Sequence, residues 1–454
     1  MTHLTRLFAA RQGKTIPRPE EGLYHFHWNH GLSNSRVHLR LDPDESGLLI
    51  VNANQVYHLN PSAAKMAFYM LHHVSQEEAT KALAKRFNIP KKILLEDYRN
   101  YAASLQDLLD EKVCPICDLD LETSLPFTAN LSAPYRMDIA LTYRCNNGCA
   151  HCYNGRSRNF PELTTQQWFK ILDHLWDLRI PHIVFTGGEP TLRQDLPELI
   201  RHAEENGQII GLNTNGRLLA NESLVNRLLE AGLDHVQITL ESHNPDIHDA
   251  MVMHKGAWDE TVEGIKNVLK TKLYVMTNTT MLTLNQDTIP DTIEFLAQLG
   301  VPTIGLNALI YSGKGKTVGT GLKDQELQPL LTAAQEITTN HHQKLIWYTP
   351  TQYCHFDPVE LNLGIKGCSA ALYNMCLEPD GSVLPCQSYY SSVGNILSDP
   401  WEKIWNHELC VQLRGRKHLP QKCSQCLIRS DCGGGCPLIF EDTVSDSFSQ
   451  AGRQ

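Results

Sequence analysis

Three closely spaced cysteines are the residues of this chain best suited to carry chemistry. Cys145, Cys149 and Cys152 form a Cys-x3-Cys-x2-Cys run directly after an apolar stretch, 137–143, that predicts a strand. Thiolates are the usual ligands of iron–sulfur clusters, and a [4Fe–4S] cube normally takes four of them. A compact set of three therefore indicates a cube with one iron open to another ligand. Zinc is the alternative, although zinc sites usually pair two Cys-x2-Cys knuckles and no fourth ligand follows nearby.

A second motif lies at the end of the next predicted strand. Residues 183–186 indicate a buried strand that leads into Gly187, Gly188, Glu189 and Pro190. A glycine pair lets the backbone approach a ligand closely, and the Glu189 carboxylate is an acceptor for an ammonium group. Together the two motifs resemble those of the radical S-adenosylmethionine (SAM) superfamily. The resemblance implies that the open iron of the cube binds the amino and carboxylate groups of SAM. It also implies that the Gly-Gly-Glu-Pro turn contacts the SAM amino group.

The segment that follows these motifs alternates strands with helices between residues 136 and 322. This order predicts a parallel sheet with helices outside it. Six such units resemble the partial (β/α)6 barrel of the radical SAM family, in which chemistry collects at the C-terminal strand ends. Both motifs lie at such ends. The strands are expected at 137–143, 182–186, 208–214, 235–240, 274–281 and 302–309, and the helices at 164–178, 195–206, 223–231, 258–270 and 288–299.

Polar residues at the ends of the later strands are further candidate SAM contacts. They suit ribose hydroxyls and the SAM carboxylate, although ordinary polar strand ends explain any one of them equally well. Relatives often carry a basic residue after the fourth strand. Here that stretch, 248–254, reads His-Asp-Ala-Met-Val-Met-His, which puts a cationic contact in doubt. An aromatic residue directly after the last cysteine lies near adenine in the family. The candidates are Tyr153, Asn213, Thr239, Ser242 and Asn307, with the segments 213–216 and 278–280 around them.

The region 20–112 predicts a small winged-helix domain. Residues 48–51 and 55–59 flank turn-forming asparagines and predict a β-hairpin. Three helices follow, of which the first two have capping signals at Asn60 and Ser75. The order resembles the PqqD-like recognition element of peptide-modifying systems. The resemblance implies that the leader of a precursor peptide adds as a strand to the sheet edge, a mode that relies on backbone hydrogen bonds. The alternative is a wing that only packs on the catalytic domain.

A second set of nine cysteines lies between residues 354 and 436, and such an ordered set rarely arises for packing alone. Its spacing resembles the SPASM extension, which carries auxiliary iron–sulfur clusters. The resemblance implies one cube on Cys368, Cys386, Cys436 and an upstream cysteine, for which Cys354 is the best candidate. The second cube lacks a cysteine after Cys436. Either it has an open iron or another residue supplies the ligand. Its expected ligands are Cys423, Cys426 and Cys432, with Cys376, Cys410 or the pair Cys114 and Cys117 as possible fourth ligands.

Length and composition narrow the remaining choices. The chain of 454 residues is expected to hold two or three domains, and its net charge of −10 gives no sign of general nucleic-acid affinity. No apolar run is long enough to span a membrane, and the first ten residues lack the apolar core of a secretory signal. Fourteen cysteines without an export signal favour metal binding over disulfides. We therefore expect a reducing, bacterial-type cytoplasm.

These observations combine into one hypothesis. The fold class is α/β, a partial (β/α)6 TIM-like barrel with an N-terminal winged-helix domain and a C-terminal cysteine-rich iron–sulfur extension. The resemblance implies reductive cleavage of SAM to a 5′-deoxyadenosyl radical, driven by an external donor such as flavodoxin or ferredoxin. The substrate is expected to be a ribosomally made precursor peptide, held through its leader. Small-molecule or tetrapyrrole modification is one alternative, and a non-catalytic iron–sulfur protein is another. The domains are expected at 20–112, 136–322 and 354–454, with a Cys-x2-Cys linker at 113–135 and a connecting helix at 323–353.

Overall fold

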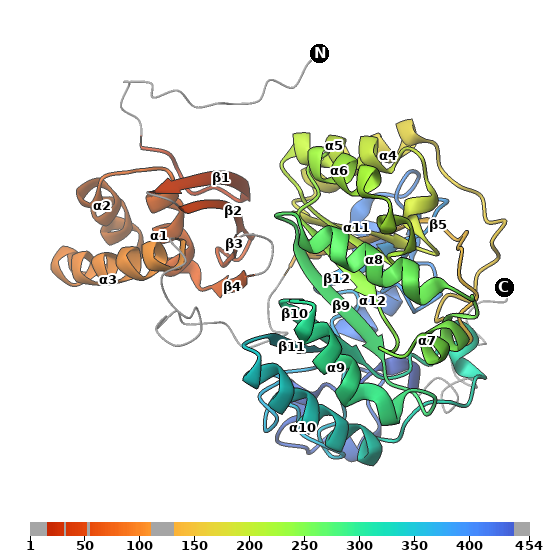
Figure 1. The fold of residues 1–454 in the computed structure, drawn as a ribbon. Coiled ribbons are helices and arrows are strands. Elements are labelled where there is room, and N and C mark those ends of the chain that lie inside the picture. The colour runs from red at the N-terminus through yellow and green to blue at the C-terminus, as the bar shows by residue number, and fades with distance from the viewer. Residues whose placement is uncertain (1–15, 31–32, 52–54, 110–130, 440–454) are drawn as a thin grey trace, which may run out of the picture. The chain divides into compact units, whose positions relative to one another are not determined.

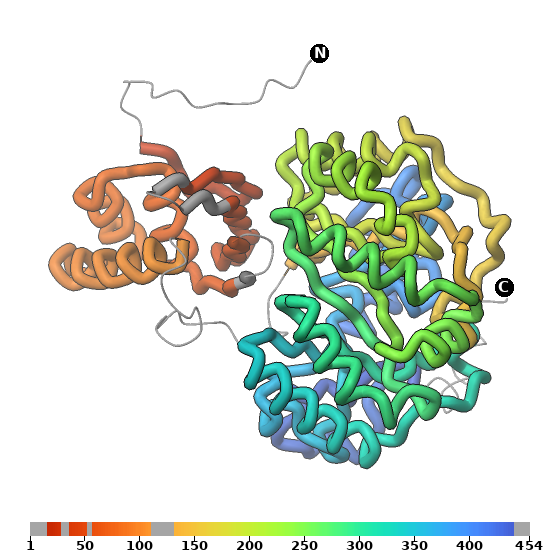
Figure 2. Tube along the Cα trace, viewed as in Figure 1, coloured from red at the N-terminus to blue at the C-terminus, as the bar shows by residue number. Residues whose placement is uncertain are grey.

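The computed structural model describes residues 16–30, 33–51, 55–109 and 131–439. The chain forms two compact units, Met1–Ser124 and Leu125–Gln454, and each is described by itself. Figures 1 and 2 show the ribbon and the trace of both units. Cys114 and Cys117 lie outside the described residues.

The first unit is an antiparallel sheet followed by three helices (Figure 1). Each strand pairs with the next along the chain, which leaves the first and last strands at the edges. The strands are β1 (Gly22–His30), β2 (Ser33–Leu41), β3 (Gly47–Val51) and β4 (Gln55–Leu59). The helices are α1 (Pro61–Leu71), α2 (Gln76–Phe87) and α3 (Lys91–Leu109).

The hairpin and the three helices expected from the sequence are present in this unit, whereas β1 and β2 were not expected. Their signal is the alternation of Tyr24, Phe26 and Trp28 with polar residues, since these three rings pack on the helical core. The Asn60 side chain accepts a hydrogen bond from the Ala63 amide at 2.8 Å and so caps α1. The Ser75 hydroxyl accepts one from the Glu78 amide at 3.3 Å and caps α2. Both caps satisfy amides that the first turn of a helix leaves free.

The second unit is built on a mostly parallel sheet. Its strand order is β11-β10-β9-β8-β7-β6-β5-β12-β13-β14. The six expected strands are β5 (Arg136–Thr142), β6 (His182–Gly187), β7 (Ile209–Thr214), β8 (His235–Thr239), β9 (Tyr274–Thr280) and β10 (Thr303–Asn307). Two further parallel strands, β11 (Lys344–Trp347) and β12 (Asn374–Leu377), extend them at either end. The antiparallel strands β13 (Ser382–Leu384) and β14 (Gly394–Asn395) follow β12. This is an α/β fold of the kind expected for a partial barrel.

Helices connect the parallel strands. The expected ones are α4 (Thr165–Asp177), α5 (Leu196–Asn206), α6 (Glu222–Glu230), α8 (Ala257–Leu269) and α9 (Ile289–Gln298). An additional helix, α7 (Pro245–Val252), occupies the stretch after β8 that the sequence suggested was a loop. The segment 323–353 contains α10 (Asp324–Asn340) and then β11, so it is not helical throughout. Two short helices, α11 (Trp401–Trp405) and α12 (Glu408–Arg414), lie near the C-terminus.

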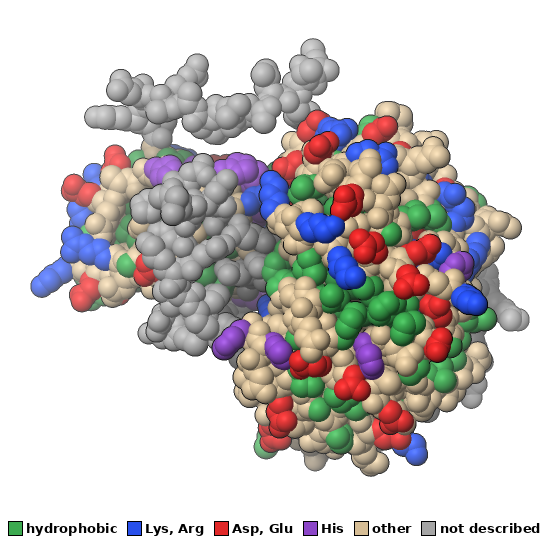
Figure 3. All heavy atoms as spheres, in the orientation of Figure 1, with side chains coloured by type: hydrophobic (Ala, Val, Ile, Leu, Met, Phe, Trp, Pro, Cys, Tyr) green, Lys and Arg blue, Asp and Glu red, His purple; other side chains and the backbone are tan. Residues whose placement is uncertain are grey.

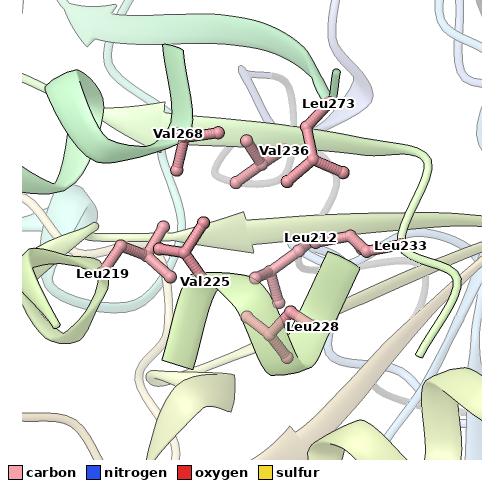
Figure 4. A pocket seen from close by; sticks show the side chains of 8 residues that line it. All are labelled: Leu212, Leu219, Val225, Leu228, Leu233, Val236, Val268 and Leu273. Atoms are coloured by element: carbon pink, nitrogen blue, oxygen red, sulfur yellow. The ribbon is translucent and has the colours of Figure 1, made fainter. Parts of the chain in front are cut away.

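An apolar layer separates the sheet from the helices outside it (Figure 4). Leu212 of β7 and Val236 of β8 face aliphatic side chains of α6, α8 and the neighbouring loops. Successive side chains of a strand point to opposite faces, so Asn213 and Gln237 lie on the face away from these helices. Both are only half-buried. The sheet therefore presents polar side chains on its inner face, where the candidate site begins.

Within the part of the chain that the structure describes, we find no helix that is both long and apolar enough to cross a membrane.

Candidate functional site

The three cysteines of the first motif lie on the loop that follows β5, and all three are half-buried. Burial raises the pKa of each thiol, and the nearby charge of Cys152 raises the pKa of Cys145 and Cys149 further. The three sulfur atoms are thus close neighbours. No three His, Cys, Asp or Glu side chains among the described residues converge on a single metal ion. In a [4Fe–4S] cube each thiolate binds a different iron, so a cluster does not require such convergence.

Three cations outside the cysteine motif hold this loop, and two of them, Arg217 and Lys314, come from distant parts of the sequence. Backbone carbonyls of the loop accept hydrogen bonds from Arg158, Arg217 and Lys314 at 2.6–3.1 Å. The charge of Arg158 also lowers the pKa of Cys145 and Cys152, against the larger effect of burial. Positive charge beside the thiols favours the thiolate form that binds metal. The short cysteine motif contains no signal for these residues, because all three lie outside it.

The Gly-Gly-Glu-Pro turn packs against the backbone at the end of β5. A Cβ atom on Gly187, whose φ is +132°, would lie 2.2 Å from the Thr142 carbonyl oxygen. One on Gly188 would lie 2.3 Å from the Arg144 carbonyl oxygen. The Gly188 and Glu189 amides donate to these same two carbonyls at 2.7 and 2.8 Å. The glycine pair therefore joins the turn to the cysteine loop, whereas the sequence suggested an approach to a ligand.

Glu189 is fully buried at the centre of this arrangement. Its Oε1 accepts hydrogen bonds from the Thr191 amide, the Thr191 hydroxyl and the Thr214 hydroxyl at 2.5–3.0 Å. Its Oε2 accepts one from the Asn215 amide at 2.8 Å. Burial raises the pKa of Glu189, and these hydrogen bonds oppose that rise. Asn215 in turn donates to the Asn146 side chain in the cysteine loop at 2.6 Å. Glu189 thus connects the ends of β6 and β7 to that loop.

The other predicted SAM contacts differ in how many hydrogen bonds their side chains already form within the protein. Ser242 is buried, and its hydroxyl lies 3.1 Å from the Thr288 hydroxyl and accepts from the Asn244 amide. Asn213 and Thr239 are half-buried, on strands β7 and β8. Asn307 donates to the Ala308 carbonyl at 2.9 Å.

Two buried acceptors at the strand ends test whether a polar ligand fits. The side-chain oxygens of Asn278 on β9 and Asn307 on β10 are buried and have no hydrogen-bond partner among the described atoms. Buried polar atoms are normally paired, so an unmatched acceptor at a site points to a ligand that donates to it. Both strands end on the side of the sheet where the cysteine loop follows β5. These residues therefore fit a ligand with hydroxyl or ammonium donors, as SAM has.

Helix α7 supports the cysteine loop from the other side. The Gly148 amide donates to the Val252 carbonyl at 2.9 Å. His248 accepts from the Glu241 amide at 3.1 Å, and His254 lies 2.8 Å from the Arg217 guanidinium. The stretch 248–254, from which a cationic SAM contact was in doubt, thus positions the cysteine loop. Arg217, which the sequence did not single out, is the cation at this place.

Tyr153 joins the cysteine loop to the C-terminal cysteine region. Its hydroxyl donates to the Gln387 side chain at 3.2 Å, and Gln387 directly follows Cys386. A parallel connection runs from Tyr143 and Arg156 to the buried carboxylate of Glu378 on the segment after β12, at 3.0 Å in each case. The two sets of cysteines are thus tied together by side chains that flank them.

The C-terminal cysteines are brought together only in part. Burial raises the pKa of Cys386 to about 12, and the charge of Cys368 contributes, so these two thiols are neighbours. Cys376 is buried near Cys386, and Cys410 is buried on α12. Cys426 is exposed and Cys423 half-buried. Burial lowers the pKa of Arg416, and the charges of Cys368 and Cys432 oppose that effect, so Arg416 lies near both cysteines. The two expected sets of cluster ligands are therefore close to one another.

The residue before Cys354 contacts a cysteine of the second set. The amide of Tyr353, the preceding residue, donates to the Cys432 sulfur at 3.4 Å. Cys432 was expected in the second cube and Cys354 in the first. Cys436 is half-buried, and the ligand sets as a whole stay predictions.

Comparisons with known proteins agree with this site. Residues 139–296 match the radical SAM superfamily model, and residues 368–427 match the SPASM model, described as an iron–sulfur cluster-binding domain. Fe-coproporphyrin III synthase of Methanosarcina barkeri is 29% identical over 327 residues, covering 65% of this chain and 81% of that protein. PqqA peptide cyclase of Bradyrhizobium diazoefficiens is 28% identical over 331 residues, covering 70% and 84%.

The fold is also similar to solved structures. SuiB of Streptococcus suis bound to its precursor peptide SuiA has a TM-score of 0.65 at 15% identity, covering 89% of this chain and 95% of that chain. A structure of SuiB bound to S-adenosylmethionine has a TM-score of 0.67 at 18% identity with the same coverage. At these identities the likeness concerns the fold. With the two domain matches and the cysteine loop, this chain is an enzyme of the radical SAM superfamily with a SPASM domain, whose cofactors are [4Fe–4S] clusters and SAM.

Proposed function

We propose that this enzyme oxidatively modifies a ribosomally made precursor peptide, through a crosslink, a thioether or a related change. The observation that carries the proposal is the likeness to SuiB, which covers 89% of the chain. That share exceeds what residues 125–454 alone make up, so the likeness extends into the N-terminal unit. The SuiB structure holds a precursor peptide, and PqqA peptide cyclase acts on a peptide by its name.

The N-terminal unit supplies a surface that suits a peptide. Its sheet ends on β1 and β4, and an extended peptide can add as a further strand at the edge of a sheet. We infer that residues 20–112 form a PqqD-like winged-helix domain and that the leader adds as a strand at one edge. Residues 113–135 would then be the linker to the core at 136–322, with the SPASM-type domain at 354–454. An external one-electron donor and a cytoplasmic location belong to the same proposal.

The residues of the core have distinct tasks in this proposal. Cys145, Cys149 and Cys152 would hold the cluster, which when bound would supply the electron for cleavage of SAM to methionine and a 5′-deoxyadenosyl radical. Arg158, Arg217 and Lys314 fix the loop that carries the three thiolates. The chain holds SAM with the turn at 187–190 and with unmatched acceptors such as Asn278 and Asn307. Their task is to orient SAM and to exclude competing reactions.

Two measurements test the proposal. Anaerobic, reduced protein is incubated with SAM and with each short peptide encoded beside its gene. The proposal predicts 5′-deoxyadenosine together with a peptide product that has lost two hydrogen atoms. It also predicts that the peptide's leader binds residues 20–112 within the full chain, measured by calorimetry. Formation of 5′-deoxyadenosine without binding or change of any encoded peptide would contradict the peptide reading while leaving the SAM chemistry in place.

Tetrapyrrole modification is the second candidate function. Fe-coproporphyrin III synthase is among the most similar proteins, and its name states a tetrapyrrole product. The same assay separates the two functions when a carboxylated tetrapyrrole replaces the peptide as substrate. A change in the mass of the tetrapyrrole, with no change in any peptide, would favour this second function.

A further inference from the structure

A strongly basic stretch surrounds two of the C-terminal cysteines. Residues 416–430, which we call the basic loop, contain four Lys and Arg residues and no Asp or Glu, in a chain of net charge −10. The cations are Arg416, Lys417, Lys422 and Arg429. On the face of the second unit that Figure 3 shows, acidic and basic side chains are interspersed instead. The basic loop is therefore a local departure from the charge of the rest of the protein.

The basic loop folds back on itself, so that its first and last residues meet. The Arg416 guanidinium donates to the carbonyl oxygen of Arg429 at 2.7 Å, which brings the two ends of the loop together. A short helix, Gln421–Cys423, lies within the loop, and a second, α13 (Arg429–Cys432), begins at its end. Because Arg416 is occupied with this closure, Lys417, Lys422 and Arg429 are the cations that the loop presents outward.

These three cations are exposed and available. All three side chains are exposed, and none forms an ion pair among the described residues. Between Lys422 and Arg429 in the sequence lie Leu427, which is 99% exposed, and Ile428, which is 42% exposed. Protein-binding surfaces combine apolar residues with polar ones. The exposed Cys426 belongs to the same surface, so a partner seated there approaches a predicted cluster ligand.

We propose that the basic loop is the docking surface for an acidic one-electron carrier protein. The inference rests on the proposed function, since reductive cleavage of SAM consumes one electron, which the carrier loses as SAM gains it. Opposite charges on two surfaces steer their encounter and raise the association rate. Electron-transfer partners form small, transient interfaces, so a docking surface of few residues is enough. Acidic flavodoxin is the probe that matches the charge of the loop.

The test compares two electron sources and two charge-reversed variants. The docking variant carries Lys417→Glu, Lys422→Glu and Arg429→Glu together. The control variant carries the same change of charge at exposed lysines on or beside other helices, Lys170→Glu, Lys266→Glu and Lys272→Glu. Formation of 5′-deoxyadenosine is measured with reduced flavodoxin at increasing concentrations, and separately with dithionite, which needs no docking surface.

With flavodoxin at low ionic strength, we expect the docking variant to need at least about tenfold more carrier for half-maximal rate than the control variant. With dithionite, the two variants should have similar rates. Equal flavodoxin requirements in both variants would overturn the proposal. Absence of 5′-deoxyadenosine from wild-type protein with dithionite would instead count against the proposed function.

A binding measurement with oxidised flavodoxin tests the proposal independently of catalytic activity. Oxidised flavodoxin is titrated into the wild-type full chain by calorimetry at low salt and at about 0.5 M NaCl, where surface charges are screened. The proposal predicts binding at low salt that weakens at least tenfold at high salt and in the docking variant, but not in the control variant. Binding that is insensitive to both changes, or no binding at low salt, would exclude the basic loop as the docking surface.

Discussion

The Tyr143 hydroxyl donates a hydrogen bond of 3.0 Å to the Glu378 carboxylate, across 235 residues of sequence. Tyr143 lies two residues before Cys145, and Glu378 lies between Cys368 and Cys386. This contact therefore couples the position of the first cysteine set to that of the C-terminal set.

Replacing Tyr143 with Phe should destabilise the second unit. The change removes one partner of Glu378, a buried carboxylate, and leaves an acceptor less well satisfied, at a cost of about 1–3 kcal/mol. Tyr390→Phe is the matched control, because the Tyr390 hydroxyl is buried without a partner among the described atoms. Urea unfolding of the anaerobic protein measures both. A Tyr143→Phe variant as stable as the control would contradict the coupling.

Glu189→Gln should weaken both the fold around the turn and SAM binding. A glutamine has a single acceptor oxygen, and its amide group would face hydrogen-bond donors that the carboxylate now accepts. The expected loss of stability is about 1–3 kcal/mol. Glu198→Gln on α5, an exposed position, is the control. Unfolding and SAM affinity are measured together, and wild-type values for both in Glu189→Gln would refute the assigned role.

Arg217→Gln should lower the iron content of the protein. The guanidinium holds the Asn146 carbonyl at 2.6 Å and the Asn147 side chain at 2.9 Å within the cysteine loop. Changes to residues that orient ligands typically cost about 10–100-fold in metal affinity or activity. The control is Arg227→Gln, an exposed arginine on α6. Iron per chain and visible absorbance report the outcome, and equal iron in both variants would argue against this support.

The second unit should become less stable as the pH is lowered, partly because of His235. Burial, and next the charge of Arg136, lower the pKa of His235 from 6.5 to about 4. The unfolded chain therefore binds this proton more readily, so stability is full above pH 6.5 and is lost as pH falls towards 4. The contribution is about 1.4 kcal/mol per pH unit in that window.

His235→Gln should remove this contribution, giving a shallower loss of stability between pH 6.5 and 4.5 than in the wild type. His342→Asn, at an exposed position, should keep the wild-type slope. Urea unfolding at several pH values gives both slopes. Identical slopes for wild type and His235→Gln would show that another group accounts for the acid sensitivity.

The sequence was sufficient wherever function depends on contiguous residues. The Cys-x3-Cys-x2-Cys loop and the Gly-Gly-Glu-Pro turn could be identified because each is a short motif at a strand end. The βα alternation predicted the six parallel strands to within a few residues, since buried strands and amphipathic helices have different periods. Caps such as Asn60 were also predictable, because their bonds are local.

Long-range contacts were beyond the sequence. The four donors to Glu189 come from its own turn and from the end of β7, and no local pattern indicates that they meet at its carboxylate. Lys314 reaches the cysteine loop from 165 residues away. Helix α7 was not predicted because it is short and because the stretch 248–254 was considered only for its lack of a basic residue. The ligand sets of the C-terminal cysteines depend on such contacts, and Cys354 illustrates how spacing alone leaves them open.

The central claim is that the thiolates of Cys145, Cys149 and Cys152 bind a cluster that cleaves SAM. Anaerobically purified protein, reduced and incubated with SAM, measures it through 5′-deoxyadenosine, alongside a Cys145→Ala variant. We predict a coloured iron–sulfur protein that forms 5′-deoxyadenosine, and a variant that forms none while keeping iron on its C-terminal cysteines. A colourless protein that holds zinc at these sulfurs and leaves SAM intact would contradict the account.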